Sequence, residues 1–207
     1  MKRKRGGCSV CLANHKRIFT SVPLLAALVL FGAAAAVVAD SASAKGRGND
    51  GAEYSEDGTV LKRCSKDVKS FTIPSSVTEI GEGAFYGCTG LESVTIPSSV
   101  TVIGKEAFLL CCWLESVTIP PSVTEIGRRA FEGCSSLESV TIPSSVTEIG
   151  GAAFWGCTGL ESVTISSSVT KIGESAFAGC SSLTIIAENG SYAWQYAERH
   201  NIPVLEL

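Results

Sequence analysis

Residues 137–159 read LESVTIPSSVTEIGGAAFWGCTG, and this 23-residue stretch recurs along most of the chain. Further copies begin at residues 68, 91, 114 and 160, and Leu183 opens a sixth copy that soon departs from the pattern. A fixed period in this range is typical of a solenoid, in which each unit buries its apolar face only by stacking on its neighbours. We therefore look for function on an outer surface and not in an enclosed pocket.

The first six residues of each copy predict a strand. Val140 and Ile142 are apolar while Ser139 and Thr141 are polar, which is the alternation that a half-buried strand requires. Pro143 lacks a backbone N–H and should end the strand.

The rest of each copy should return the chain to the start of the next coil. Val146 and Ile149 form a second short apolar pair, and Gly150 after them is expected to make a turn with positive φ. In the return arm, Phe154 and Cys157 are the expected inward side chains. One copy is thus one coil.

Stacked coils place equivalent residues in columns about 4.8 Å apart. Three apolar columns should form a continuous core: Leu91, Leu114, Leu137, Leu160 and Leu183; Ile80, Ile103, Ile126, Ile149 and Ile172; and Phe85, Phe108, Phe131, Phe154 and Phe177. The outward face of the main sheet should carry hydroxyl groups. We call Ser93, Thr95, Ser116, Thr118, Ser139, Thr141, Ser162 and Thr164 the hydroxyl face.

The repeated pattern LxxVTIPxSVTxIGxxAFxGCxxL, over residues 68–183, resembles the BspA-type leucine-rich repeat, a family of mostly bacterial and some protist surface proteins. The resemblance implies a β-rich leucine-rich-repeat solenoid with short helical or irregular return arms. It also implies a surface protein that binds a protein of a host, a partner cell or the matrix, and it brings no catalytic residues and no cofactor. Ser166 replaces the proline of the other copies. Leu110 replaces a glycine, so the pattern does not predict the return arm of the second copy.

Residues 1–44 differ in composition from the repeats. Six basic residues precede an uncharged run over residues 22–39, and Ala42-Ser43-Ala44 then offers a small-x-small cleavage pattern. These features predict an export signal, either cleaved after Ala44 or retained as an N-terminal membrane anchor, because the run is just long enough to cross a bilayer. In both cases the basic residues favour a cytoplasmic N-terminus, so the repeats should be secreted or at the cell surface.

The charge balance argues against a nucleic-acid partner. The whole chain carries 17 basic and 20 acidic residues, and setting aside the six bases and Asp40 of the leader leaves 11 and 19, a net charge of −8 over residues 45–207. Nucleic acids and anionic membranes attract basic surfaces. A membrane contact is therefore expected only through an uncleaved anchor.

The two ends of the repeat region should be closed by caps. Residues 45–67 are expected to form a linker and an N-terminal cap, because Asp57-Gly58 between two short arms is a hairpin signal. The hairpin would cover the open edge of the first strand, ahead of the five repeats of residues 68–182.

Residues 183–207 should form a partial repeat and a C-terminal cap. Ser191 can cap a helix from Tyr192 to about His200, and Pro203 prevents its continuation.

Five cysteines share one repeat position, at Cys88, Cys111, Cys134, Cys157 and Cys180. We expect them to be buried as small apolar side chains, because stacked residues hold their Cβ atoms slightly too far apart for disulfides. No metal site is expected, because zinc needs a tetrahedral cluster and no histidine is near the column. Cys64 and Cys112 lie outside the column and are candidates for exposed thiols.

Charged residues also share repeat positions. Glu92, Glu115, Glu138 and Glu161 should line one edge of the main sheet, either as a solvated rim or as a weak strip for divalent cations or a basic ligand. Opposite charges should pair between neighbouring coils, at Glu82 with Lys105, Glu106 with Arg129, and Glu148 with Lys171.

Two surfaces are candidates for binding a partner protein. Repeat proteins commonly bind on their sheet, which favours the hydroxyl face. The alternative is the face formed by the return arms, where Tyr86, Leu109, Trp113 and Trp155 could act as anchors.

The sequence thus predicts an exported, non-catalytic protein for protein binding or adhesion at the cell surface. The alternative is a passive spacer or assembly element without a specific ligand. An enzyme is not expected, because His200 is the one histidine beyond the leader and no serine has a base beside it.

Overall fold

The computed structural model describes residue 48 and residues 51–207. The predicted leader, with its uncharged run at residues 22–39, lies outside the described residues. Within the described part of the chain, no helix is long and apolar enough to cross a membrane.

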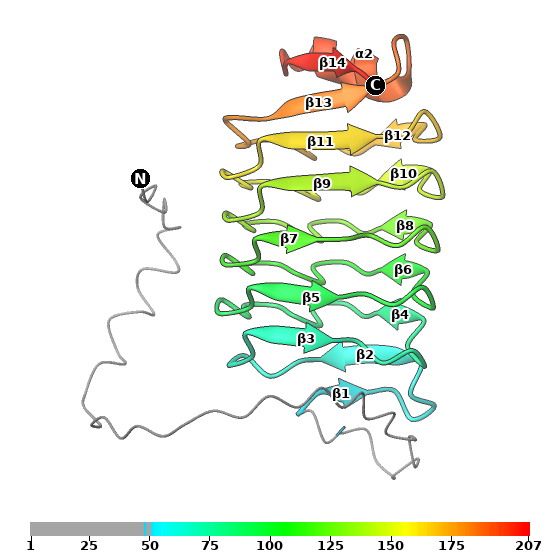
Figure 1. Cartoon of the computed structure of the whole chain (residues 1–207), viewed down its shortest axis with the longest axis vertical. Coiled ribbons are helices and arrows are strands. Elements are labelled where there is room, and N and C mark those ends of the chain that lie inside the picture. Colours follow the sequence, from blue (N-terminus) through cyan, green and yellow to red (C-terminus); the bar gives the residue numbers. More distant parts are fainter. Residues whose placement is uncertain (1–47, 49–50) are drawn as a thin grey trace, which may run out of the picture.

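The coils stack one on another in a single column, with β1 (Glu53–Tyr54) at one end and α2 (Tyr192–Arg199) at the other (Figure 1). The first strand of each coil belongs to the side that carries the hydroxyl face. These strands are β3 (Ser70–Thr72), β5 (Ser93–Thr95), β7 (Ser116–Val117), β9 (Ser139–Ile142), β11 (Ser162–Ile165) and β13 (Thr184–Ala187). They pair in parallel with equivalent residues opposite each other, as Ser162 with Ser139. They form one sheet of β3, β5 and β7 and another of β9, β11 and β13, to which the C-terminal strand β14 (Val204–Glu206) adds.

The isoleucine of the second apolar pair of each coil, with the residue before it, also forms a strand, which the sequence pattern had not predicted. These two-residue strands are β4 (Glu79–Ile80), β6 (Val102–Ile103), β8 (Glu125–Ile126), β10 (Glu148–Ile149) and β12 (Lys171–Ile172). They form a seven-stranded sheet together with β1 (Glu53–Tyr54) and β2 (Val60–Arg63). Each coil therefore contributes to two parallel ladders.

The N-terminal hairpin forms as predicted, but it covers a different edge. Strands β1 and β2 are antiparallel, and β2 continues in parallel on β4, not on β3. This register places the fully buried Leu61 opposite Ile80, so that the hairpin extends the isoleucine column of the core.

The return arms are runs of turns tied to their neighbours by backbone hydrogen bonds. Ala153 N donates to Gly150 O within the coil (3.2 Å), while Phe154 N donates to Ala176 O of the next coil (2.8 Å). The second copy follows the same path, because Leu110 adopts a φ of 62°, close to the 70° of the equivalent Gly156.

Glycine at the end of the second strand has a different role from the one expected. Gly150 is not among the residues with positive φ. A Cβ atom at this position would lie 2.5 Å from the Gly127 carbonyl carbon of the preceding coil. The close approach of neighbouring coils, and not a left-handed turn, therefore requires glycine there.

The three predicted core columns are buried as expected. The phenylalanine rings stack almost parallel, with centroids 4.8 to 5.3 Å apart from Phe85 to Phe177. An edge-to-face ring closes each end of the stack, Phe71 at 5.6 Å and Tyr196 at 6.0 Å. The two end contacts are edge-on, one of the arrangements that aromatic pairs prefer.

The C-terminal cap contains helix α2 (Tyr192–Arg199), as predicted. Ser191 caps the helix by accepting a hydrogen bond from Trp194 N (3.2 Å). Buried Ala193, Tyr196 and Ala197 face the last coil. The chain then adds β14 (Val204–Glu206) in parallel to β13, a strand that the sequence pattern had not indicated.

Candidate binding surfaces

The hydroxyl face lies where the sequence predicted, on the outward side of the first strands. Its members on β5 and β9, together with Ser116 and Thr118, are exposed, while Ser162 and Thr164 on β11 are half-buried. Parallel pairing in register aligns Ser93 with Ser116 in one sheet, and Ser139 and Thr141 with Ser162 and Thr164 in the other. The carboxylates of Glu92, Glu115, Glu138 and Glu161 are exposed beside the rows.

The return-arm face differs from its prediction at two positions. Tyr86 and Trp155 are 50% and 48% exposed, so both are available to a partner. Leu109 is only 6% exposed, so it is part of the packed structure and its assignment as a surface anchor was wrong. Trp113 is half-buried.

Glu132, which occupies the repeat position of Tyr86 and Trp155, is the buried charged residue that sequence reasoning missed. It is 7% exposed and accepts hydrogen bonds from Arg129 Nε (2.5 Å) and from the same guanidinium's second nitrogen (3.2 Å). Arg129 also bonds Glu106 in the preceding coil (3.3 Å), and these carboxylates raise the pKa of its guanidinium. Arg129 three residues before a carboxylate was the signal that could have revealed this pair.

The predicted ion pairs between coils are present. Lys105 Nζ lies 2.5 Å from Glu82, Arg129 lies 3.3 Å from Glu106, and Lys171 Nζ lies 2.7 Å from Glu148. Their partly exposed positions mean that each contributes little to stability.

A hollow lies beside Trp155 on the return-arm face. Its volume is about 470 Å³, and we call it the Trp155 hollow. It is lined by Arg128, Arg129, Glu132, Gly151, Ala152, Trp155, Glu174 and Ser175.

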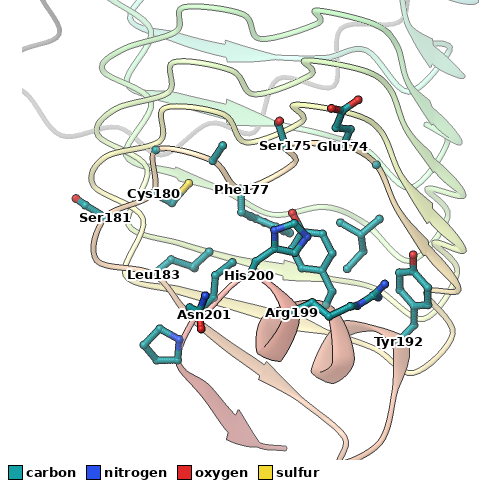
Figure 2. Close-up of a pocket in the computed structure, with 17 residues that line it drawn as sticks. Glu174, Ser175, Phe177, Cys180, Ser181, Leu183, Tyr192, Arg199, His200 and Asn201 are labelled. Carbon is teal, nitrogen blue, oxygen red and sulfur yellow. The ribbon is translucent and has the colours of Figure 1, made fainter.

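A larger cavity of about 700 Å³, the end cavity, lies between the last coil and α2 (Figure 2). His200 stands over the ring of Tyr196, with ring centroids 4.2 Å apart. The guanidinium of Arg199 lies 5.4 Å from the centre of the Tyr192 ring. The Cys180 thiol borders the same cavity and donates a hydrogen bond to Phe154 O (3.1 Å).

The cysteine column is buried, as predicted, except that Cys180 at its end is half-buried. Each thiol also has a polar partner: Cys111, Cys134 and Cys157 donate to the phenylalanine carbonyl of the preceding coil at 3.1 to 3.3 Å. Burial raises the pKa of the Cys88 thiol to about 11, which keeps it protonated and unreactive at neutral pH.

The two cysteines outside the column are not exposed. Cys64 is 4% and Cys112 is 2% exposed, so the expectation of exposed thiols was wrong. Among the described residues, no group of histidine, cysteine and acidic side chains is arranged to hold a metal ion.

Comparisons with known proteins agree with this geometry. A profile of the BspA type leucine rich repeat region matches residues 60–184 with six copies. The match begins eight residues before the first full copy at Val68, where β2 starts the seven-stranded sheet. No curated protein matches the chain significantly.

Several solved structures share the fold. A leucine rich cell surface protein from Faecalibacterium prausnitzii A2-165 is 40% identical, with a TM-score of 0.64 over 70% of this chain and 39% of its own. The T. pallidum leucine rich repeat protein TpLRR is 33% identical, with a TM-score of 0.60 over 65% of this chain and 67% of its own. A leucine-rich repeat protein from Eubacterium ventriosum ATCC 27560 is 26% identical, with a TM-score of 0.63 over 67% and 38%. The chain thus spans well under half of the first and third of these structures.

Proposed function

This chain belongs to the BspA-type leucine-rich-repeat family, and from that premise we propose that it is a non-catalytic protein-binding module at the cell surface, with the hydroxyl face as its docking surface. The F. prausnitzii structure is described as that of a cell surface protein, which supports the same location for this chain. The leader predicted at residues 1–44 of this chain would provide the export route.

One observation carries the proposal: six of the eight hydroxyl side chains are exposed, and within each of two sheets the strands of this face pair in parallel and in register. Hydroxyl groups both donate and accept hydrogen bonds. Because the strands already hold these groups in place, a partner can bind them with little ordering cost on this side. The neighbouring glutamates would favour a partner with basic residues at the rim of the contact.

The test is capture of a partner from extracts of cell-surface and matrix proteins by the immobilised full chain. The binding variant carries Thr95→Lys, Thr118→Lys and Thr141→Lys, which place three cations on the hydroxyl face. The matched control carries Thr101→Lys, Thr124→Lys and Thr147→Lys, which change three exposed threonines of the same coils at another repeat position.

We expect saturable capture of a reproducible protein by the wild type and by the control, and at least a tenfold loss in the binding variant. Equal loss in both variants would point to general charge repulsion and would contradict docking on the hydroxyl face. Absence of saturable capture would favour the alternative, a passive spacer or assembly element.

A further inference from the structure

The Trp155 hollow lies where the fourth coil carries two small residues and the two coils before it carry long side chains. The pair Gly151-Ala152 occupies the repeat positions that hold Lys105-Glu106 and Arg128-Arg129 in the two preceding coils. The missing side chains leave open space of about 470 Å³, within the range of about 300–1,000 Å³ typical of small-molecule sites.

Three chemical groups surround this space. The indole of Trp155 is about half exposed and supplies an apolar aromatic face. Arg128 lines the hollow from the preceding coil and Glu174 from the following one. Figure 2 shows the side chains of Glu174 and Ser175 directed away from α2, toward the earlier coils.

Arg128 and Glu174 are not used in the ion pairs of this face. The salt bridges of the described chain engage Arg129, Lys105 and Lys171 and leave Arg128 and Glu174 without a charged partner. Both are exposed, so their donors and acceptors are available to a ligand.

We propose that the Trp155 hollow binds one or two sugar units of a neutral glycan, with a sugar ring against the Trp155 indole and its hydroxyl groups hydrogen-bonded to Arg128 and Glu174. The face of an aromatic ring matches the apolar C–H face of a pyranose. A guanidinium can donate to two adjacent hydroxyls, and a carboxylate can accept from two.

The two signs of charge favour a neutral ligand over a charged one. An anion would be attracted by Arg128 and repelled by Glu174, and a cation would meet the opposite combination. A polyol makes use of both, because each hydroxyl donates and accepts. The Trp155 hollow is separate from the hydroxyl face. The glycan proposal is therefore tested independently of the protein-binding proposal.

The test measures binding of cellotetraose, chitotetraose and mannotetraose to the full chain by saturation-transfer NMR and titration. Trp155→Ala removes the stacking surface. Gly151→Lys fills the hollow and offers Glu174 a partner; Gly151 has no positive φ, and an added Cβ atom would lie at an ordinary 3.4 Å from Glu174 O. Tyr86→Ala is the matched control, since Tyr86 is equally exposed at the equivalent position but does not line the hollow.

We expect at least one saccharide to bind, with affinity reduced at least tenfold by Trp155→Ala and by Gly151→Lys and changed less than twofold by Tyr86→Ala. Arg128→Gln and Glu174→Gln, which alter exposed side chains only, should each weaken binding three- to tenfold. Binding of none of the three saccharides, or binding unaffected by both hollow variants, would overturn the proposal. A short peptide rich in arginine and lysine is tested in parallel, and hollow-dependent binding of that peptide alone would assign the site to a basic protein segment instead.

Discussion

Two glycines recur in most coils, and the structure requires them for different reasons. Gly150 lies against the backbone of the preceding coil, where a Cβ atom would approach to 2.5 Å. Gly156 has a φ of 70° and nothing within 4 Å of an added Cβ atom. The first is constrained by a neighbour and the second by its own backbone conformation.

This difference predicts unequal costs for the same substitution. Gly150→Ala should lower the free energy of unfolding by about 2 kcal/mol or more, because two backbones must separate. Gly156→Ala should lower it by only about 1 kcal/mol, the strain of a left-handed alanine. Urea denaturation of the two variants measures both, and a larger loss for Gly156→Ala would contradict the close-approach explanation.

Asp57 organises the turn of the N-terminal hairpin. Its Oδ1 atom accepts hydrogen bonds from Ser55 Oγ (2.5 Å), Thr59 N (3.1 Å) and Thr59 Oγ1 (2.8 Å). The bond from Ser55, followed by those from Thr59, lowers the pKa of the carboxyl from 3.8 to about 2.

Because the folded pKa lies below the unfolded value, this contribution to stability is complete above about pH 4 and disappears as the pH falls toward 2. NMR titration of the Asp57 carboxyl carbon should give a midpoint near 2, and the amide signals of Thr59 and Val60 should shift with it. In Asp57→Asn those amide shifts should vanish. A midpoint near 3.8 would show that the hydrogen bonds do not favour the charged form.

At the scale of the structural elements, the phenylalanine stack runs through the five coils and places the ring of each coil against that of the next. Its rings run from Phe85 to Phe177 at spacings set by the coil-to-coil distance, and Phe71 and Tyr196 close it from outside the repeat position. Sequence periodicity identified the stack, whereas the two closing rings come from positions that break the period.

Removing one ring from the middle should cost more than removing a closing ring. Phe131→Ala deletes a fully buried side chain with a neighbour on each side, and we expect a loss of about 3–5 kcal/mol in the free energy of unfolding. Tyr196→Ala removes contact with a single ring of the phenylalanine stack, Phe177, and leaves its space next to exposed His200, so its loss should be smaller. Thermal and urea denaturation compare the two, and equal losses would show that the end of the stack is packed as tightly as its middle.

At the scale of the whole described chain, residues 51–207 form a linear array, in which each coil stacks on the coil before it and the coil after it. Stability in such an array is close to a sum of local terms, and end units are opened most easily. The hairpin covers one end of the array, and α2 with β14 covers the other. These caps make the end coils harder to open, but the end coils remain less stable than the central ones.

Hydrogen exchange should therefore follow position in the stack. Amides of the central coils, such as Phe108 and Phe131, whose N–H groups donate to the next coil at 2.7 Å, should be the most protected. Protection should decline toward β1 and β14. Mass spectrometry of exchange-labelled peptides measures the profile, and uniform protection from end to end would indicate that the array unfolds as one unit.

The sequence alone determined the solenoid, its columns, the hydroxyl face, the ion pairs between coils and the C-terminal helix, because each follows from residues that recur at one period or from a local capping signal. Only the tertiary structure decided the features that depend on contacts between neighbouring coils, whose equivalent residues are 23 positions apart in the sequence. It buried Leu109 and Glu132 between the exposed Tyr86 and Trp155, directed the hairpin onto β4, and opened the Trp155 hollow beside Gly151. Exposure at a repeat position is set by the side chains above and below it, and a pattern read along the chain does not contain that contact.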